Sequence, residues 1–167
     1  MQLQEQLKDF LKGISLMRSQ KKEPGWKFSC YEELYLKYGI FMEPGIAPED
    51  IKGAPSRCYY NCHQLIRKRE YKNLTYVEGY AIALDVSFPI NHAWLMDSDG
   101  CAIDPTWRET GLLYFGIPLN NSWVKSFIKA RPRNYDLSIF TGNYLEDFSL
   151  LKEGLPPNAI AKLKINL

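Results

Sequence analysis

The residue best placed to do chemistry is Cys58, which stands near the start of a predicted helix. Ser56 is typical of a helix N-cap, and the helix is expected to run from about Arg57 to Arg69. The first N–H groups of a helix lack helical acceptors and its N-terminus carries partial positive charge, and both features favour a thiolate. This position suits a catalytic thiol, although it equally suits a small buried residue.

A histidine and an aspartate follow on two strands that are predicted to pair. His92 opens the strand NHAWLMD and Asp104 lies in CAIDPTW, with a three-residue hairpin loop between the strands and Gly100 in a left-handed position. In this register His92 is opposite Thr106, and Asp104 is the diagonal neighbour of His92 on the same face. A slip of one residue would place the two side chains on opposite faces.

Together, Cys58, His92 and Asp104 have the residue types of a nucleophile, a base and the group that orients the base. A carboxylate bonded to the imidazole would fix its tautomer and stabilise the imidazolium. The imidazole would keep the thiol ionised and later protonate the leaving amine. The backbone N–H of Cys58 is the natural first donor to an oxyanion, and the sequence does not identify a second.

The other cysteines and the second histidine are expected to be structural. Cys62 lies one turn after Cys58 on the face that must meet the sheet, Cys30 is at a helix start with no base nearby, and Cys101 is in a strand. His63 points to another helix face and is expected at the surface or in packing. A metal site is an alternative, but the spacing is not that of a usual zinc knuckle, so no metal and no cofactor are predicted. Its ligands would be Cys58, Cys62, His63 and His92.

Four further residues are candidates to line a substrate cleft. Trp94 alternates onto the face of His92, where it either shelters the His–Asp pair or fills the core. Trp107 and Tyr114 come just after Asp104, and Asn61 is near Cys58 in sequence but on another helix face. Glu78 alternates with its neighbours and is expected to be an exposed sheet residue, with an ion pair to an Arg or a substrate contact as alternatives.

Before these residues, the chain has helical and then irregular character. Apolar residues at three- and four-residue spacing predict an amphipathic helix over 2–18. A second helix is expected to start at Ser29, with Glu32 completing a capping box, and to stop at Gly39. Prolines and glycines predict an irregular connection over 39–55, with a short turn at its centre.

After the helix of Cys58, β-branched and aromatic residues predict a strand in TYVEGYAIAL, ahead of the His–Asp hairpin. An aromatic segment LLYFGIPL and a helix WVKSFIKA ended by Pro132 come next, followed by two short helices near 143–153 and 156–165. Helices thus precede and follow a consecutive run of strands. This order predicts an α+β fold with an antiparallel sheet.

Four motifs in this order resemble the transglutaminase-like superfamily of cysteine enzymes. They are SRCYYNC on a helix, then YVEGYA, NHAWLMD and DGCAIDPTW. The family signature is a Cys at a helix start, a strand ending in Gly-Tyr, a strand beginning His-Ala-Trp and a strand with Asp-Pro-Thr. The match covers roughly residues 56–107, about a third of the chain. The chain also resembles a group of uncharacterised bacterial and bacteriophage proteins with this compact core.

The resemblance implies a papain-like core in which the helix of the nucleophile packs on an antiparallel sheet or partial barrel. It also implies Cys58 as the nucleophile, His92 as the base and Asp104 as the orienting residue. The expected chemistry is attack on a carbonyl carbon: amide or peptide hydrolysis, deamidation, or acyl transfer to an amine. The substrate would be a protein, a peptide or a small amide. The alternative is a catalytically silent binding or regulatory module on the same fold, such as a bacteriophage-type inhibitor or adaptor.

Length and composition limit the number of domains and the classes of partner that can be expected. The 167 residues suggest one domain, with a core at about 56–107 and helical flanks at 1–50 and 120–167. The net charge of +2 argues against nucleic-acid binding through a strong basic field. No apolar run approaches the ~20 residues that span a bilayer, and the N-terminus lacks the apolar stretch of a signal peptide. Four scattered cysteines then suggest reduced thiols in a cytoplasm.

Overall fold

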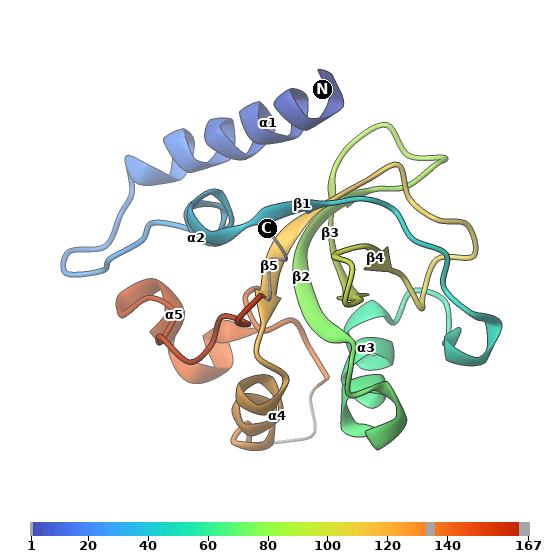
Figure 1. The fold of residues 1–167 in the computed structure, drawn as a ribbon. Coiled ribbons are helices and arrows are strands. Elements are labelled where there is room, and N and C mark those ends of the chain that lie inside the picture. The colour runs from blue at the N-terminus through green and yellow to red at the C-terminus, as the bar shows by residue number, and fades with distance from the viewer. Residues whose placement is uncertain (1, 133–135, 164–167) are drawn as a thin grey trace.

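The fold is given by a computed structural model that describes residues 2–132 and 136–163 (Figure 1). The strands of the described chain are β1 (Ile40–Met42), β2 (Thr75–Ile82), β3 (Ile90–Met96), β4 (Ala102–Ile103) and β5 (Leu113–Leu119). Its α-helices are α1 (Gln2–Ser19), α2 (Tyr31–Tyr38), α3 (Cys58–Arg67), α4 (Asn121–Lys129) and α5 (Ser149–Lys152). Short 3-10 helices occupy Glu49–Ile51, Arg69–Tyr71 and Asn143–Glu146. The predicted α+β class is therefore confirmed.

The strands form one antiparallel sheet in the order β1-β5-β2-β3-β4. The sheet curls until its two edges meet, because the chain after β1 pairs with β4. Gly45 N–H donates to Ala102 O at 2.8 Å, and Ala102 N–H donates to Glu43 O at 2.8 Å. The aromatic segment LLYFGIPL is a full strand, β5, and it lies between β1 and β2.

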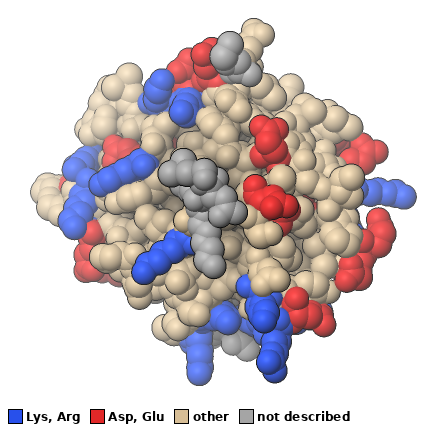
Figure 2. All heavy atoms as spheres, viewed as in Figure 1, with Lys and Arg blue, Asp and Glu red and all other residues tan. Residues whose placement is uncertain are grey.

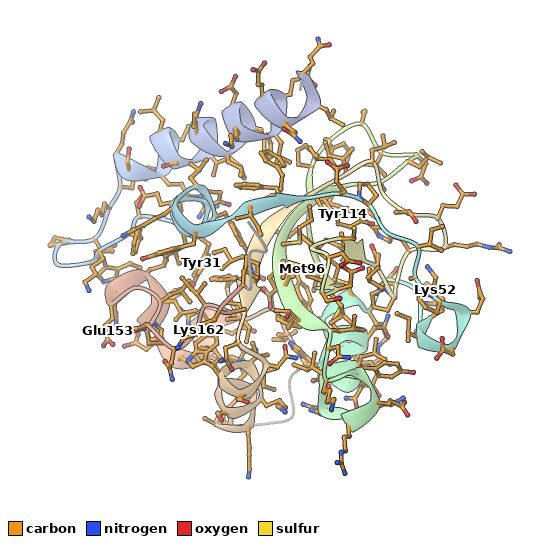
Figure 3. All side chains as sticks on the ribbon, in the orientation of Figure 1. Tyr31, Lys52, Met96, Tyr114, Glu153 and Lys162 are labelled. Carbon is orange, nitrogen blue, oxygen red and sulfur yellow. The ribbon has the colours of Figure 1, made fainter. Side chains whose placement is uncertain are left out.

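The helices cover the outer face of this curled sheet, and a small apolar cluster fills its inner face (Figure 1). Met96 and Tyr114 belong to the inner cluster and point into the space that the sheet encloses (Figure 3). Trp94 is fully buried there. It fits because β5 carries Gly116 beneath it, where a Cβ would lie 2.8 Å from Trp94 Cη2.

The predicted N-terminal helix is confirmed as α1, whose Leu7 and Leu11 are buried. The second helix begins two residues later than predicted, and its cap differs. The Ser29 hydroxyl and backbone N–H both donate to Glu33, not to Glu32, at 2.6 and 2.9 Å. Glu32 instead accepts a hydrogen bond from the Tyr80 hydroxyl of β2 at 2.7 Å. Its carboxylate is therefore bonded to the sheet and does not complete the predicted capping box.

Two more predicted boundaries need correction. Asp104 lies just after β4, because pairing with β3 stops at Leu95–Ile103. Residues 156–163 are not helical: they begin with two prolines, and Ile160 pairs with Leu119 of β5. The last two residues of that predicted helix lie outside the described chain. Within the described ranges, no helix is both long and apolar enough to cross a bilayer.

Candidate active site

The predicted hairpin register is confirmed by the pairing of β3 with β4. Leu95 is opposite Ile103 and Met96 is opposite Ala102. Beyond them Asp97 N–H donates to Cys101 O at 3.1 Å, and Gly100 has φ +83°, the left-handed conformation that the loop needs. His92 and Asp104 therefore come onto the same inner face of the sheet.

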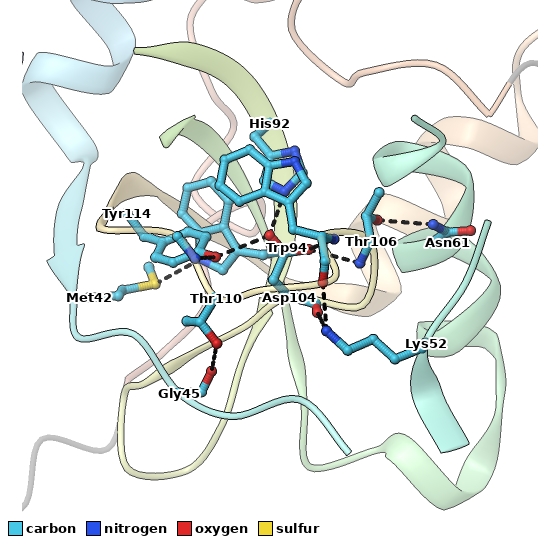
Figure 4. A network of polar contacts seen from close by, with 12 residues as sticks. Met42, Gly45, Lys52, Asn61, His92, Trp94, Asp104, Thr106, Thr110 and Tyr114 are labelled. Atoms are coloured by element: carbon cyan, nitrogen blue, oxygen red, sulfur yellow. Dashed lines mark hydrogen bonds and ion pairs between the residues drawn. The ribbon is translucent and has the colours of Figure 1, made fainter. Parts of the chain in front are cut away.

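These two side chains form a buried hydrogen-bonded pair (Figure 4). His92 Nε2 lies 2.7 Å from Asp104 Oδ2, and both residues are at most 3% exposed. Asp104 Oδ2 also accepts from the Tyr114 hydroxyl at 3.1 Å. Its other oxygen accepts from the backbone N–H groups of Thr106 and Trp107 at 2.8 and 3.2 Å. Four donors thus fix the carboxylate, which in turn fixes the imidazole.

The electrostatics of the pair favour imidazolium opposite carboxylate. Burial is the largest influence on the His92 pKa and lowers it, but interactions with Asp104 and with Cys58 together raise the pKa to about 9. Burial would raise the pKa of Asp104, yet His92 and the two backbone N–H groups hold it below its usual value. His92 is therefore protonated and Asp104 ionised at neutral pH.

Cys58 is the first residue of α3, and Arg57 rather than Ser56 occupies the N-cap position. Ser56 has φ +58°, a left-handed backbone, and no side chain caps the helix. The first α3 hydrogen bond runs from Asn61 N–H to Arg57 O at 2.9 Å, so the N–H groups before Asn61 are the unpaired ones of a helix start. The predicted helix-end position of the thiol is thus confirmed, one residue closer to the end.

The Cys58 thiol lies near His92, whose Nε2 is already bonded to Asp104. Cys58 is half-buried, and its side chain is close enough to raise the His92 pKa. Among the hydrogen bonds of the described residues none joins Cys58 to His92. Catalytic hydrogen bonds are often long without substrate and shorten in the complex.

Three contacts tie the α3 end to the turn that carries Asp104, and Figure 4 shows the one between Asn61 and Thr106. Asn61 Nδ2 donates to Thr106 Oγ1 at 2.9 Å and to Ala54 O at 2.8 Å. Gly53 N–H donates to Pro105 O at 2.7 Å. Both hydrogens of the Asn61 amide are used in these bonds, so Asn61 holds the two segments together. The prediction that Asn61 lines a substrate cleft is therefore wrong.

Lys52 adds a fourth tie that the sequence did not suggest. Its Nζ donates to the carbonyl oxygens of Asp104 and Trp107 at 3.1 and 2.6 Å, from the loop after β1 (Figures 3 and 4). An irregular loop gives no periodicity from which such a contact can be predicted. Lys52 nevertheless closes the turn on which the carboxylate sits.

The three aromatic candidates have three different environments. Trp107 stacks on the His92 ring, with ring centroids 4.1 Å apart and planes at 14°, and it is half-buried. Trp94 fills the inner core and donates its Nε1–H to Met42 Sδ at 3.2 Å. Tyr114 is fully buried, and its hydroxyl bonds to Asp104 and Gly111. Only Trp107 reaches a groove, so Trp94 and Tyr114 are not cleft residues.

Glu78 is not an exposed sheet residue as predicted, because β2 is covered on both faces. It is 1% exposed and accepts from the Tyr76 and Ser138 hydroxyls at 2.5 Å each and from Ile139 N–H at 2.6 Å. The segment that contributes Ser138 and Ile139 lies sixty residues away in sequence, so strand alternation alone could not place it.

His63 belongs to the same polar cluster and is fully buried. Its Nδ1 lies 3.1 Å from Asp136 Oδ1, and its Nε2 lies 2.9 Å from the Tyr76 hydroxyl. Both ring nitrogens are therefore occupied. Of the two predicted roles for His63, surface or packing, the packing role is confirmed, because the side chain is fully buried.

The remaining cysteines are poor nucleophiles. Burial raises the pKa of Cys62 well above its ordinary value and that of Cys30 to about 11. The pKa of Cys101 is raised by desolvation and by nearby carboxylates such as that of Asp97. The described residues contain no group of three or more His, Cys, Asp or Glu side chains that could hold a metal ion.

Two surface grooves adjoin the helix end. The first, of about 680 Å³, runs along α3 and includes Arg57, Tyr60 and Arg67. The second, of about 690 Å³, lies between Leu84 on the loop after β2 and Trp107 after β4. Both grooves include Ser56, two residues before the thiol.

Comparison with known proteins identifies no relative. No family model, no curated protein and no solved structure matches the chain. The functional interpretation therefore depends on the geometry of the site.

Proposed function

We propose that this protein is a cysteine-dependent hydrolase or acyltransferase that acts on an amide or peptide bond through Cys58, His92 and Asp104. The observation that carries the proposal is the buried 2.7 Å bond between His92 Nε2 and Asp104 Oδ2. It leaves the other ring nitrogen for the thiol at the start of α3. The transglutaminase-like motifs of the sequence agree with the same three residues.

In the proposed reaction the Cys58 thiolate attacks the carbonyl carbon of the substrate amide. The negative charge that develops on the carbonyl oxygen is met by backbone N–H groups at the start of α3, that of Cys58 first. These groups have no helical acceptor and lie beside the nucleophile. They need no reorganisation when the charge forms.

His92 then supplies the proton that the leaving group needs. With a pKa of about 9 it carries that proton at neutral pH, and it donates to the amine nitrogen as the C–N bond breaks. The product is a thioester on Cys58. Water or an amine, deprotonated by the now neutral imidazole, attacks the thioester and releases the thiol, which gives hydrolysis or acyl transfer respectively.

Asp104 keeps the imidazole in place through both steps. Its four hydrogen bonds come from a turn, a strand and an inner tyrosine, so its position is set by the folded sheet. Trp107 covers one face of the imidazole and limits access of water to the His–Asp bond.

Acylation by an activated ester tests the proposal without knowledge of the natural substrate. The protein is mixed with p-nitrophenyl acetate, release of p-nitrophenol is followed, and the acetyl group is located by peptide mass spectrometry. We expect a burst of one equivalent and acetyl-Cys58, with hydroxylamine diverting the acyl group from water to a hydroxamate. Peptide anilides then test amide cleavage.

The matched controls are Cys58→Ala, which loses the burst, and Cys62→Ala, which keeps it. Acetylation of another cysteine, or a burst that survives Cys58→Ala, contradicts the proposal. No acylation of a folded wild-type protein by either reagent supports the alternative of a silent binding module.

A further inference from the structure

The two grooves beside the site differ in chemistry and share Ser56, two residues before the reacting thiol. Each groove is lined by a neighbour of one partner of the reaction. The first includes Arg57, the residue before Cys58. The second is walled by Trp107, which stacks on His92. A chain that passes from one groove to the other therefore runs over Ser56, beside the helix start that carries Cys58.

The size of the grooves favours an extended substrate. Each has about the volume that a drug-sized ligand occupies, and both are open to the surface. A small amide would fill one enclosed pocket next to the thiol. Two open grooves that join at Ser56, next to the helix start, instead fit several residues of a polypeptide on either side of the reacting carbonyl.

The first groove carries an uncompensated positive charge. Arg57 is exposed, its guanidinium lies over the Tyr60 ring at 4.1 Å, and within the described ranges no carboxylate pairs with it. Arg67 in the same groove is bonded to Asp136 at 3.4 Å. Lys and Arg side chains also gather over the lower part of the face seen in Figure 2, where α3 and α4 lie. Stacking on Tyr60 holds the Arg57 charge at the groove while leaving its N–H groups to a ligand.

The second groove is mainly apolar at its walls. Trp107, Val86 and Ile90 contribute to it, and Leu84 is 57% exposed there. Its charged residues include both signs, Asp85 and Glu109 against Arg108. An exposed leucine that lines the same groove as an indole is suited to an apolar side chain of a ligand.

We infer that the substrate is an extended polypeptide segment that places an acidic side chain against Arg57 and an apolar side chain between Leu84 and Trp107, with the reacting carbonyl between them. This inference rests on the proposed function only for the position of the carbonyl. The two side-chain sites also bind a segment when no reaction takes place.

Binding to a variant that cannot react tests the inference. The Cys58→Ala protein is titrated against fluorescein-labelled peptides of about eight residues, roughly 27 Å when extended, followed by fluorescence anisotropy. Each peptide carries one Glu and one Leu on opposite sides of a central Gln, in both orders. Matched peptides replace Glu by Lys, or Leu by Ser.

We expect one order to bind best, with the Glu-to-Lys and Leu-to-Ser replacements each weakening binding about tenfold. Arg57→Glu in the Cys58→Ala background reverses the preference from Glu to Lys, and Leu84→Ser removes the preference for Leu. Lys72→Glu, an exposed charge change outside both grooves, leaves both preferences intact. Reversal by a charge swap distinguishes a contact from a folding defect.

Equal binding of all peptides, no binding of any, or preferences that survive Arg57→Glu and Leu84→Ser would each overturn the inference. These results are independent of the acylation experiment. If wild-type Cys58 is acetylated but the peptides bind without selectivity, the proposed function stands and the inferred substrate is wrong. If the peptides bind selectively but Cys58 is not acylated, the inferred binding stands and the proposed function is wrong.

Discussion

The protein has two histidines, and each is buried and bonded to an aspartate, yet among the described residues only His63 has both ring nitrogens in hydrogen bonds. His63 uses Nδ1 for Asp136 and Nε2 for Tyr76. His92 uses Nε2 for Asp104, and it lies close enough to Cys58 for the thiol to raise its pKa. A histidine–carboxylate pair is thus not sufficient for chemistry. The second nitrogen must face a nucleophile.

The cysteines that accompany the two histidines differ in the same way. Cys62 is fully buried within α3, and burial raises its pKa well above the ordinary value. Cys58 is half-buried at the helix start, where backbone N–H groups are unpaired. The same helix therefore offers one inert thiol and one that is accessible, four residues apart.

The largest difference is expected between the two cysteine variants. Cys58→Ala should reduce acyl transfer by a factor on the order of 10³ or more, because no other thiol reaches His92. Cys62→Ala should keep the activity and cost about 1 kcal/mol of folding free energy, since it leaves a small cavity. Ester hydrolysis rates and urea unfolding of both variants measure this contrast. Equal activity of the two variants would contradict the claim that only the thiol at the helix start is reactive.

The two histidine variants should separate activity from stability. His92→Gln is expected to reduce acyl transfer by about 10²-fold or more through loss of the proton donor. His63→Gln should leave Cys58 acylation nearly unchanged but lower the free energy of unfolding by about 2 kcal/mol, because Asp136 and Tyr76 lose a buried partner. A His63→Gln protein that is stable but inactive would show that the second pair takes part in the reaction.

The pH dependence of stability should distinguish wild type from His92→Gln. The His92 pKa is raised from 6.5 to about 9 in the folded state, so folding binds a proton more tightly. The resulting stabilisation is complete below pH 6.5 and is lost as the pH rises through about 9; its size is on the order of 3 kcal/mol. Urea unfolding at neutral pH and above pH 9 should show a loss in wild type beyond that in His92→Gln. Parallel curves for the two proteins would contradict a charged His92–Asp104 pair.

A smaller effect is expected when Tyr114 is replaced by Phe. The change removes one of the four hydrogen bonds to Asp104 and frees the Gly111 N–H. Acyl transfer should fall about tenfold because Asp104 is held less rigidly, and the alkaline limit of activity should move to higher pH, since a carboxylate with one donor fewer stabilises the imidazolium more strongly. Tyr76→Phe is the matched control, since it removes a buried hydroxyl from the His63 cluster and should change stability without moving that limit. A shift of the limit in both variants would mean that the two clusters are coupled.

The sequence predicted the site better than its surroundings because the site depends on local rules. A hairpin loop with Gly100 sets the register, and the register alone brings His92 to Asp104. The helix start of Cys58 was predicted to within one residue, although Arg57 and not Ser56 is the N-cap and no side chain caps the helix. The hairpin was predictable without knowledge of the rest of the fold.

The errors concern residues whose partners are distant in sequence. Glu78 alternates as an exposed residue would, but Ser138 and Ile139 cover it. Tyr114 and Lys52 hold the Asp104 turn through contacts across ten and more than fifty residues. Nothing in the local pattern of either residue indicates its partner, because the curl of the sheet brings them together.

The rate of Cys58 alkylation by iodoacetamide as a function of pH, in wild type and His92→Gln, tests the central claim most directly. Peptide mass spectrometry reads each cysteine separately, and buried Cys30 and Cys62 serve as internal references. We predict that Cys58 alone reacts fast at neutral pH, and that His92→Gln slows this reaction there but not above pH ~9, where free thiols are ionised. If Cys58 reacts like a free thiol in both proteins, or does not react in either, the thiol and the imidazole do not act as a pair.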